Sequence, residues 1–193
     1  MTNDEILAAF KDCGALQHGH FQLTSGRHSD SYMQCARVLE SPSLTTRMAR
    51  ELVSRLPQGA RADVVASPAV GGILIGFAVA EALDLPFIFS ERKEDQMIFR
   101  RGFHVAPGAK VFVVEDVVTT GGSVQEVTGL VEQAGGEVAG VLSLVDRGGS
   151  KKFDKPFYPL LALDIASWAP EDCALCQQGQ ALTSPGSRRL SAQ

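Results

Sequence analysis

The fold of this 193-residue chain is decided by one stretch, Val111-Phe112-Val113-Val114-Glu115-Asp116-Val117-Val118-Thr119-Thr120-Gly121-Gly122-Ser123. Its first four residues predict a buried strand, because a parallel strand covered on both faces reads as a continuous apolar run. The acids Glu115 and Asp116 follow at the carboxyl end of that strand, which in an open α/β sheet is the edge where ligands bind. We therefore expect this stretch to lead from a central strand into a binding site.

The second half of the stretch is a loop of small, hydroxylated and glycine residues that runs into a helix. Such a loop can wrap its backbone N–H groups around a phosphate, and the N-terminus of the helix favours the negative charge. The side chains of Thr119, Thr120 and Ser123 supply further donors, and Gly121 and Gly122 let the backbone approach closely. Carboxylates beside a phosphate repel it, so the acids suit a neutral hydroxylated group such as a ribose diol. The stretch therefore predicts a site for a phosphorylated ribose.

The rest of the chain alternates between patterns typical of strands and patterns typical of helices, which predicts a parallel sheet covered on both faces. The helix at 73–83 is apolar nearly all round, as expected of a helix enclosed in a core. A short helix is expected at the start of the chain with Asn3 as its N-cap, followed by a polar stretch flanked by short strand-like pieces. The other predicted strands are 64–66, 87–89, 138–145 and 160–165, and the other predicted helices begin at Ser41-Pro42 and near Val124.

Composition and charge exclude several classes of protein. Hydrophobic residues make up 45% and charged residues 21% of the chain, which is typical of a soluble globular domain with a full core. The net charge of −4 argues against a general nucleic-acid binder, which needs a basic footprint. No apolar run approaches the roughly 20 residues needed to cross a bilayer, and the first ten residues do not have the pattern of a signal peptide. We expect a cytoplasmic protein without a nucleic-acid or membrane partner.

The four cysteines predict reduced thiols rather than disulfides, because no secretory signal accompanies them. The pair Cys173 and Cys176 has the spacing of half a zinc site or of a redox pair. Cys13 and Cys35 are not spaced as a second pair, so we favour reduced thiols near a surface turn and keep metal binding as the alternative. Three histidines near the N-terminus are interpreted as polar groups rather than ligands: His18, His20 and His28.

The stretch at 111–123 resembles the phosphoribosyl-pyrophosphate signature of the type I phosphoribosyltransferases. Further segments, in chain order, resemble the members of that family that act on orotate; they are Leu23–Ser29, Ser67–Ile73, Ser90–Glu94, Leu144–Arg147 and Pro185–Arg188. The resemblance implies an α/β fold with a parallel, Rossmann-like core and a small N-terminal hood. A single domain would then span 1–193, with the hood from about 1–40 plus the C-terminal segment and the core from about 41–170.

The resemblance also implies an activity. The 5-phosphoribosyl group of phosphoribosyl pyrophosphate would pass to N1 of orotate, giving orotidine 5′-monophosphate and pyrophosphate in pyrimidine nucleotide synthesis. Catalysis would consist mainly of positioning and electrostatic stabilisation of an oxocarbenium-like ribose. Mg²⁺ would arrive on the donor, because this hard ion keeps most of its waters and needs no dedicated protein cage. A mobile loop beginning at Ser90 would reach into the neighbouring subunit, which implies a homodimer with shared active sites.

Residue roles follow from the same resemblance. Glu115 and Asp116 would hold the ribose hydroxyls, and the loop at 119–123 would cradle the 5′-phosphate. Arg147 would pair with the orotate carboxylate or ring carbonyls, since a guanidinium fork matches such acceptors. The leaving pyrophosphate would be neutralised by Arg92 and Lys93, which with Asp116 form the predicted catalytic set. The hood would add substrate contacts from Ser25 and Arg27.

The sequence departs from the family pattern in the loop and in the hood. Gln96 and Ile98 stand where many members have a lysine and a histidine, and Thr24 stands where many have a lysine. These departures leave the charge of the loop open to Arg100, Arg101 or His104.

Two alternative functions remain. A purine phosphoribosyltransferase would share the donor signature, but a purine has no carboxylate for Arg147 to pair with. A nucleic-acid-binding regulator with this fold would need a basic face or an added helix-turn-helix segment, and the charge of −4 goes against it.

Overall fold

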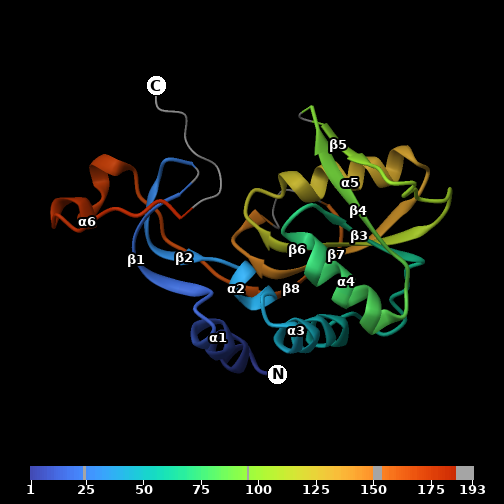
Figure 1. The fold of residues 1–193 in the computed structure, drawn as a ribbon, viewed down its shortest axis with the longest axis horizontal. Coiled ribbons are helices and arrows are strands. Elements are labelled where there is room, and N and C mark those ends of the chain that lie inside the picture. The colour runs from blue at the N-terminus through green and yellow to red at the C-terminus, as the bar shows by residue number, and fades with distance from the viewer. Residues whose placement is uncertain (24, 95, 150–153, 186–193) are drawn as a thin grey trace.

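The computed structural model describes residues 1–23, 25–94, 96–149 and 154–185, and its centre is a six-stranded sheet (Figure 1). The strands lie in the order β5-β4-β3-β6-β7-β8, and all pairs are parallel except β4 with β5. Their bounds are β3 Val64–Pro68, β4 Phe87–Lys93, β5 Gln96–Phe99, β6 Lys110–Val118, β7 Glu137–Asp146 and β8 Phe157–Ala162. The mostly parallel α/β fold predicted from the sequence is confirmed, with β6 in the interior of the sheet.

Helices cover both faces of this sheet, and side chains of β6 alternate between the two layers. Phe112 and Val114 pack into the core beneath α3 (Pro42–Ser54) and α4 (Gly72–Leu83). Val111 and Val113 pack into the core on the other side, beneath α5 (Gly122–Gln133). This alternation with a period of two is what a central strand requires, because both of its faces are buried.

The N-termini of two helices are set by capping residues that adjoin them in the sequence. Ser41 caps α3 as predicted, with its hydroxyl accepting from the amide of Leu44 and a proline in the first turn. The predicted N-cap of α1 (Asn3–Asp12) was wrong by one residue, because Thr2 and Glu5 form a capping box. The hydroxyl of Thr2 accepts from the amide of Glu5 at 3.2 Å, and the carboxylate of Glu5 accepts from the amide of Thr2 at 2.8 Å. Two orphan amides are thereby satisfied at once, which Asn3 could not do.

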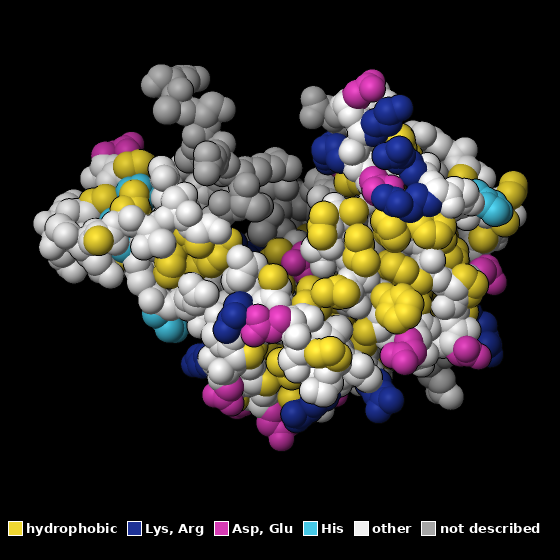
Figure 2. All heavy atoms as spheres, viewed as in Figure 1, with side chains coloured by type: hydrophobic (Ala, Val, Ile, Leu, Met, Phe, Trp, Pro, Cys, Tyr) yellow, Lys and Arg dark blue, Asp and Glu magenta, His cyan; other side chains and the backbone are white. Residues whose placement is uncertain are grey.

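Helix α4 is not enclosed on all sides, contrary to the prediction from its apolar sequence. Ile75 and Val79 are fully buried, but Leu74 is 55% and Phe77 61% exposed, and Val70 just before the helix is 82% exposed. Figure 2 shows hydrophobic side chains gathered on this face, below the basic side chains of the β4–β5 hairpin. An apolar pattern predicts burial but not the element that provides it, and in the single chain the outer face of α4 is open. We call Val70, Leu74 and Phe77 the α4 patch.

Two further predictions of element boundaries differ from the structure. The segment 90–94 was expected to begin a mobile loop, but β4 continues through it to Lys93 and pairs with the unpredicted β5. Antiparallel pairing of Lys93 with Gln96 closes this hairpin, which projects beyond the sheet in Figure 1. The last strand runs over Phe157–Ala162 rather than 160–165, because its pairing with β7 begins at Phe157.

The two ends of the chain form a smaller unit beside the sheet. Strands β1 (Leu16–Gln22) and β2 (His28–Met33) form an antiparallel hairpin, and α2 (Ala36–Leu39) leads from it to the core. The C-terminal segment carries a short 3-10 turn η2 (Pro170–Asp172) and helix α6 (Ala174–Gln177). It lies against the hairpin in Figure 1. Trp168 and His28 exchange two backbone hydrogen bonds of 2.8 Å each, and Thr183 exchanges another pair with Gln22 and His20.

We call this unit the hood. Thr24 and most of the Pro185–Arg188 segment, both named in the sequence analysis, lie outside the described residues. Among the helices of the described part of the chain, none has the length and apolar character that a bilayer span requires.

Candidate active site

The acidic pair lies in the carboxyl-terminal half of β6, although the strand continues past the predicted end at Val114 and through both acids to Val118. Glu115 is buried and faces Ser143 of β7 in the strand register, while Asp116 is half-buried. The amide of Asp116 donates to Oε1 of Glu115 at 3.1 Å, and the amide of Val117 donates to Oδ1 of Asp116 at 2.8 Å. The carboxylates are thus fixed by their own backbone before any ligand is present.

Burial makes ionisation of both carboxyl groups less favourable. It raises the pKa of Glu115 well above its usual range, and the neighbouring charge of Asp116 raises that pKa further. Burial also raises the pKa of Asp116, although hydrogen bonds from Glu115 and from the amide of Val117 oppose the rise. Two adjacent carboxylates, one buried and one half-buried, favour a ligand that donates hydrogen bonds or carries positive charge. Perturbed carboxyl groups at a sheet edge are also typical of functional sites.

A glycine pair at the start of α4 lies directly against these acids. A methyl group added to Gly71 would stand 2.8 Å from both carboxylate oxygens of Asp116, and one on Gly72 would stand 2.9 Å from the carbonyl oxygen of Val114. The preceding peptide bond, Ala69–Val70, is cis. The glycines were not among the site residues predicted from the sequence. Their role becomes visible only when β3, α4 and β6 are packed together.

The predicted phosphate loop connects β6 to α5 and lines a small pocket next to Glu115. The residues of this loop in the pocket are Thr119, Thr120, Gly121, Gly122 and Ser123. Gly121 has φ +75°, and none of the described side chains caps the start of α5. The first amides of a helix have no partner within it and carry partial positive charge, so this loop and helix start offer donors to an anion.

The loop after β7 packs against the phosphate loop and carries Arg147. Oδ1 of Asp146 accepts from the amides of Gly148 and Gly149 at 2.9 and 3.0 Å, and the amide of Arg147 donates to the carbonyl of Val118 at 2.8 Å. A methyl group on Gly149 would stand 2.8 Å from the carbonyl oxygen of Thr119. The two loops are therefore held in one arrangement.

The side chain of Arg147 has a buried hydrogen-bond donor available to a ligand. Its Nε is buried and has no hydrogen-bond partner among the residues that the structure describes. Burial lowers the pKa of the guanidinium, and the nearby Tyr32 and Cys35 partly oppose that effect. A buried donor without a partner is costly, so an acceptor from a ligand would remove that cost.

The sequence analysis missed two hood residues at this site, Tyr32 and Cys35. Burial raises the pKa of Tyr32, whose phenol also interacts electrostatically with Arg147 and Asp116. Burial raises the pKa of the Cys35 thiol well above its usual range, with Asp116 and Glu115 adding to the effect, and its Sγ lies 3.7 Å from the carbonyl oxygen of Asp116. Neither residue belongs to a recognisable spacing, because docking of the hood on the sheet is what brings them to the acids.

The remaining predicted residues have their described contacts outside this cluster. Arg27 bonds to the hydroxyl of Ser167 at 3.0 Å and also to its carbonyl, while Ser25 is exposed in the β1–β2 turn. Arg92 forms an ion pair with Glu126 of α5, and Lys93 is exposed near the tip of the β4–β5 hairpin.

One of the substitute cations considered for this hairpin is already engaged. Arg101 makes two hydrogen bonds of 2.9 Å to Glu91 and packs over the ring of Phe89. It is thereby less available to a ligand than its position in the sequence indicated.

An α/β sheet with an acidic pair and a glycine-rich loop at the start of a helix on its carboxyl edge is the arrangement expected of proteins that bind a phosphorylated ribose. The family model for the phosphoribosyl transferase domain matches residues 37–176, which is more than half of the chain.

Named relatives extend this match over nearly the whole sequence. The chain is similar to the orotate phosphoribosyltransferase of Heliobacterium modesticaldum, with 49% identity over 97% of this chain and 100% of the relative. It is 50% identical to the orotate phosphoribosyltransferase of Chlorobaculum parvum over 97% of both chains. The crystal structure of orotate phosphoribosyltransferase from Aeropyrum pernix matches with a TM-score of 0.73 at 26% identity, over 82% of this chain and 93% of that one. The chain belongs to the phosphoribosyltransferase family, and within it to the orotate phosphoribosyltransferases.

Proposed function

We propose that this protein transfers the 5-phosphoribosyl group of phosphoribosyl pyrophosphate to N1 of orotate, giving orotidine 5′-monophosphate and pyrophosphate. This is a step of pyrimidine nucleotide synthesis, for which we expect a cytoplasmic location. The observation that carries the proposal is the placement of the acidic pair, the phosphate loop and Arg147 at one edge of the sheet. These groups match, in turn, a ribose diol, a 5′-phosphate and an anionic acceptor base.

The acids and the loop would bind the donor through opposite ends of its ribose phosphate. Glu115 and Asp116 accept hydrogen bonds from the two ribose hydroxyls, and the loop amides donate to the 5′-phosphate. With both ends held, C1′ is fixed in position for attack by N1 of the base. Positive charge develops on the ribose as pyrophosphate leaves, and the two carboxylates stabilise that charge electrostatically.

Arg147 would select orotate among bases. Its guanidinium would pair with the orotate carboxylate or with a ring carbonyl. Its Nε, which has no hydrogen-bond partner in the described part of the chain, would supply one of these bonds. Adenine and hypoxanthine offer no carboxylate, so they would leave this buried donor less well satisfied. A buried polar group left without its partner discriminates strongly between substrates.

Magnesium is the metal ion that this reaction implies, and we propose that it is carried by the donor. The acidic pair fits a cation close by, because positive charge would favour the ionised forms of two carboxyl groups whose pKa values burial has raised. Glu115 and Asp116 would hold the ion through the ribose hydroxyls or through its waters. When bound, it neutralises charge on the leaving pyrophosphate.

Arg92 and Lys93 would act on the pyrophosphate of a neighbouring subunit. The hairpin that carries them projects from the edge of the sheet, and Arg92 forms an ion pair with Glu126 rather than with the acids. The α4 patch supports association into a homodimer, since exposed apolar side chains gathered on one face mark interaction surfaces. Its first residue, Val70, adjoins the glycine that contacts Asp116, so a subunit docked there would lie beside the site.

The direct test is an absorbance assay with purified protein, orotate, phosphoribosyl pyrophosphate and Mg²⁺. Uracil, adenine and hypoxanthine are run in parallel as competing acceptors. We expect orotate to be consumed with stoichiometric release of pyrophosphate, and neither to occur when Mg²⁺ is chelated. Donor binding without consumption of any base would contradict the proposal and favour a regulatory protein with this fold.

A further inference from the structure

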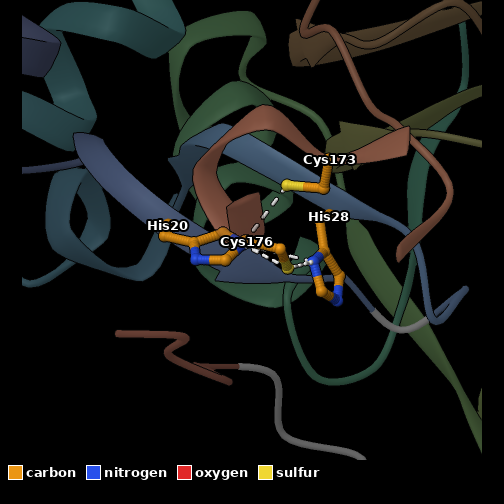
Figure 3. A group of neighbouring side chains, drawn as sticks. All are labelled: His20, His28, Cys173 and Cys176. Atoms are coloured by element: carbon orange, nitrogen blue, oxygen red, sulfur yellow. Dashed lines mark hydrogen bonds between the residues drawn. The ribbon is translucent and has the colours of Figure 1, made fainter. Parts of the chain in front are cut away.

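Four side chains that could ligate a metal meet in the hood, far from the acidic pair in the sequence (Figure 3). His20 comes from β1, His28 from the start of β2, and Cys173 and Cys176 from the C-terminal segment around α6. One potential ligand atom from each residue lies within 4.8 Å of the other three. The sequence analysis expected reduced thiols at a surface turn and found no second pair for the cysteines. The cysteines are free thiols as expected, but Cys173 is fully buried rather than at the surface, and His20 and His28, 145 or more residues away in the chain, lie beside the pair.

Four of the six distances between the ligand atoms are close to those around a single tetrahedral metal ion, and all six are within 4.8 Å. Nε2 of His20 lies 3.2 Å from Nδ1 of His28, 3.4 Å from Sγ of Cys173 and 3.7 Å from Sγ of Cys176. Sγ of Cys176 lies 3.2 Å from Nδ1 of His28. Around zinc, with bonds of about 2.3 Å to sulfur and about 2.0–2.1 Å to nitrogen, tetrahedral ligand atoms stand roughly 3.3–3.8 Å apart. Little movement is needed for all four atoms to reach one ion.

Hydrogen bonding alone does not account for the cluster. Nδ1 of His20 lies 2.8 Å from the carbonyl oxygen of Gln180. A carbonyl only accepts, so Nδ1 carries the proton and a neutral His20 presents one lone pair on Nε2. Three groups, from His28, Cys173 and Cys176, converge on that nitrogen. If each thiol donates to one histidine, Nε2 of His20 and Nδ1 of His28 face each other at 3.2 Å as two acceptors. One cation between the four atoms removes that conflict.

The surroundings are those of a metal ligand. A ligating histidine commonly donates its other ring N–H to a backbone carbonyl, which fixes both tautomer and ring orientation, and His20 does this with Gln180. His20, His28 and Cys173 are buried, and only Cys176 is exposed. Metal could therefore enter from the side of Cys176 and would then be enclosed by protein.

We propose that the hood contains a structural zinc site formed by His20, His28, Cys173 and Cys176. Four protein ligands leave no open position, so the ion binds and orients the chain without taking part in the reaction. It ties the β1–β2 hairpin to the C-terminal segment, which the backbone hydrogen bonds of Trp168 and Thr183 already bring together. The ion thereby supports the same hairpin that carries Tyr32 to the active site. This proposal is independent of the transferase activity.

The test begins with metal content, using untagged protein so that no polyhistidine tag binds metal. Protein purified under reducing conditions without added chelator should contain about one zinc per chain by elemental analysis. Cys176→Ser is the variant of choice, because this exposed thiol can be changed with little risk to folding. It should lose most of the zinc, while the matched control Cys13→Ser, which removes a thiol outside the cluster, should keep it.

Two measurements keep the proposal testable if any variant misfolds. Chelator-treated wild-type protein should have a Tm lower by roughly 5 °C or more, and zinc should restore it. The same protein reconstituted with Co²⁺ should develop the intense visible bands of tetrahedral cobalt and thiolate charge transfer. Wild-type zinc no higher than that of Cys176→Ser, together with no cobalt spectrum, would overturn the proposal. Recovery of a Cys173–Cys176 disulfide from protein kept reduced would overturn it as well.

Discussion

Gly71 and Asp116 are so close that a methyl group on the glycine would stand 2.8 Å from both oxygens of the carboxylate. The backbone of Gly71 is helical, with φ −58° and ψ −42°, so an alanine there meets no backbone strain. Glycine is therefore needed at this position for the space it leaves beside Asp116, and not for its backbone conformation. This contact couples the segment before α4 to the end of β6, the two elements that would surround the donor.

Gly71→Ala should therefore impair use of the donor while leaving the fold intact. The added methyl group must displace the Asp116 carboxylate, and an overpacked contact costs about 1–3 kcal/mol. We expect kcat/KM for phosphoribosyl pyrophosphate to fall by roughly 10- to 100-fold. Gly129→Ala is the matched control, because a methyl group there meets nothing within 4 Å. Equal donor kinetics in the two variants would exclude the proposed contact.

The buried Glu115 predicts a stability that falls as pH rises. Its folded-state pKa is raised well above the ordinary 4.5, so in the window above 4.5 the folded chain holds a proton that the unfolded chain has lost. The free energy of unfolding then decreases with pH across that window, and the folded state is most favoured below it.

Glu115→Gln removes this titratable group. The Tm of the variant should therefore increase relative to the Tm of the wild type as pH rises above 4.5. Melting curves at a series of pH values check this, with the exposed Glu81→Gln as the control that should follow the wild type. A constant difference in Tm between Glu115→Gln and wild type would show that burial does not raise this pKa. Binding of the donor should weaken in the same variant, because an amide accepts at one atom where the carboxylate accepts at two.

Arg147 should act on the acceptor base rather than on the donor. Loss of a charge-assisted, partly buried pair costs about 1.5–3 kcal/mol. We therefore expect Arg147→Ala to raise KM for orotate by roughly 10- to 100-fold, with KM for phosphoribosyl pyrophosphate nearly unchanged. Arg147→Lys should recover only part of the loss, since an ammonium cannot reproduce the planar fork. A larger effect on the donor than on orotate would reassign the residue to the pyrophosphate.

The core of the fold could be predicted from sequence because it depends on local patterns. The apolar run of β6, the acids at its end and the small residues before α5 are adjacent in the chain, and each indicates its own structure. Tyr32 could not be found in this way, since it reaches Arg147 only through docking of the hood on the sheet. The partnership of His20 with Cys173 spans 153 positions, and neither residue carries a signal for the other. Local sequence thus predicted most elements of the core but not β5, while contacts between distant elements completed both clusters.

Packing between β3 and α4 gives a prediction about stability alone. A methyl group on Gly76 would overlap the Ser67 hydroxyl and stand 2.7 Å from the ring of Phe87. Because Ser67 is fully buried, relief would require movement of the sheet or the helix. Gly76→Ala should lower the free energy of unfolding by about 1–3 kcal/mol.

Gly129→Ala should instead raise the free energy of unfolding. Alanine is favoured over glycine in a helix interior by up to about 1 kcal/mol, and α5 has room at this position. Denaturant unfolding of both variants provides the comparison. A stabilised Gly76→Ala protein would mean that the packing of α4 on β3 is looser than the structure indicates.

The hairpin at Arg92 and Lys93 predicts catalysis shared between subunits, and mixed dimers can test it. Lys93→Ala should lower kcat more than it raises KM for the donor, because its charge matters most as pyrophosphate leaves. Asp116→Asn should weaken binding of the ribose at the site of the subunit that carries the substitution. A dimer with one subunit of each kind has one site with an intact acidic pair facing an intact hairpin, provided that the hairpin acts across the interface.

Co-expression of the two variants under different affinity tags allows the mixed dimer to be isolated. If the hairpin acts on the partner's site, this dimer should regain about half of the wild-type activity, one working site of two. If it acts on its own site, both sites carry a defect and activity stays at the level of the single variants. Leu74→Glu in the α4 patch supplies the accompanying control, since a charge in that patch should shift the protein towards monomer in sedimentation. A Leu74→Glu protein that remains dimeric would place the shared interface elsewhere on the surface.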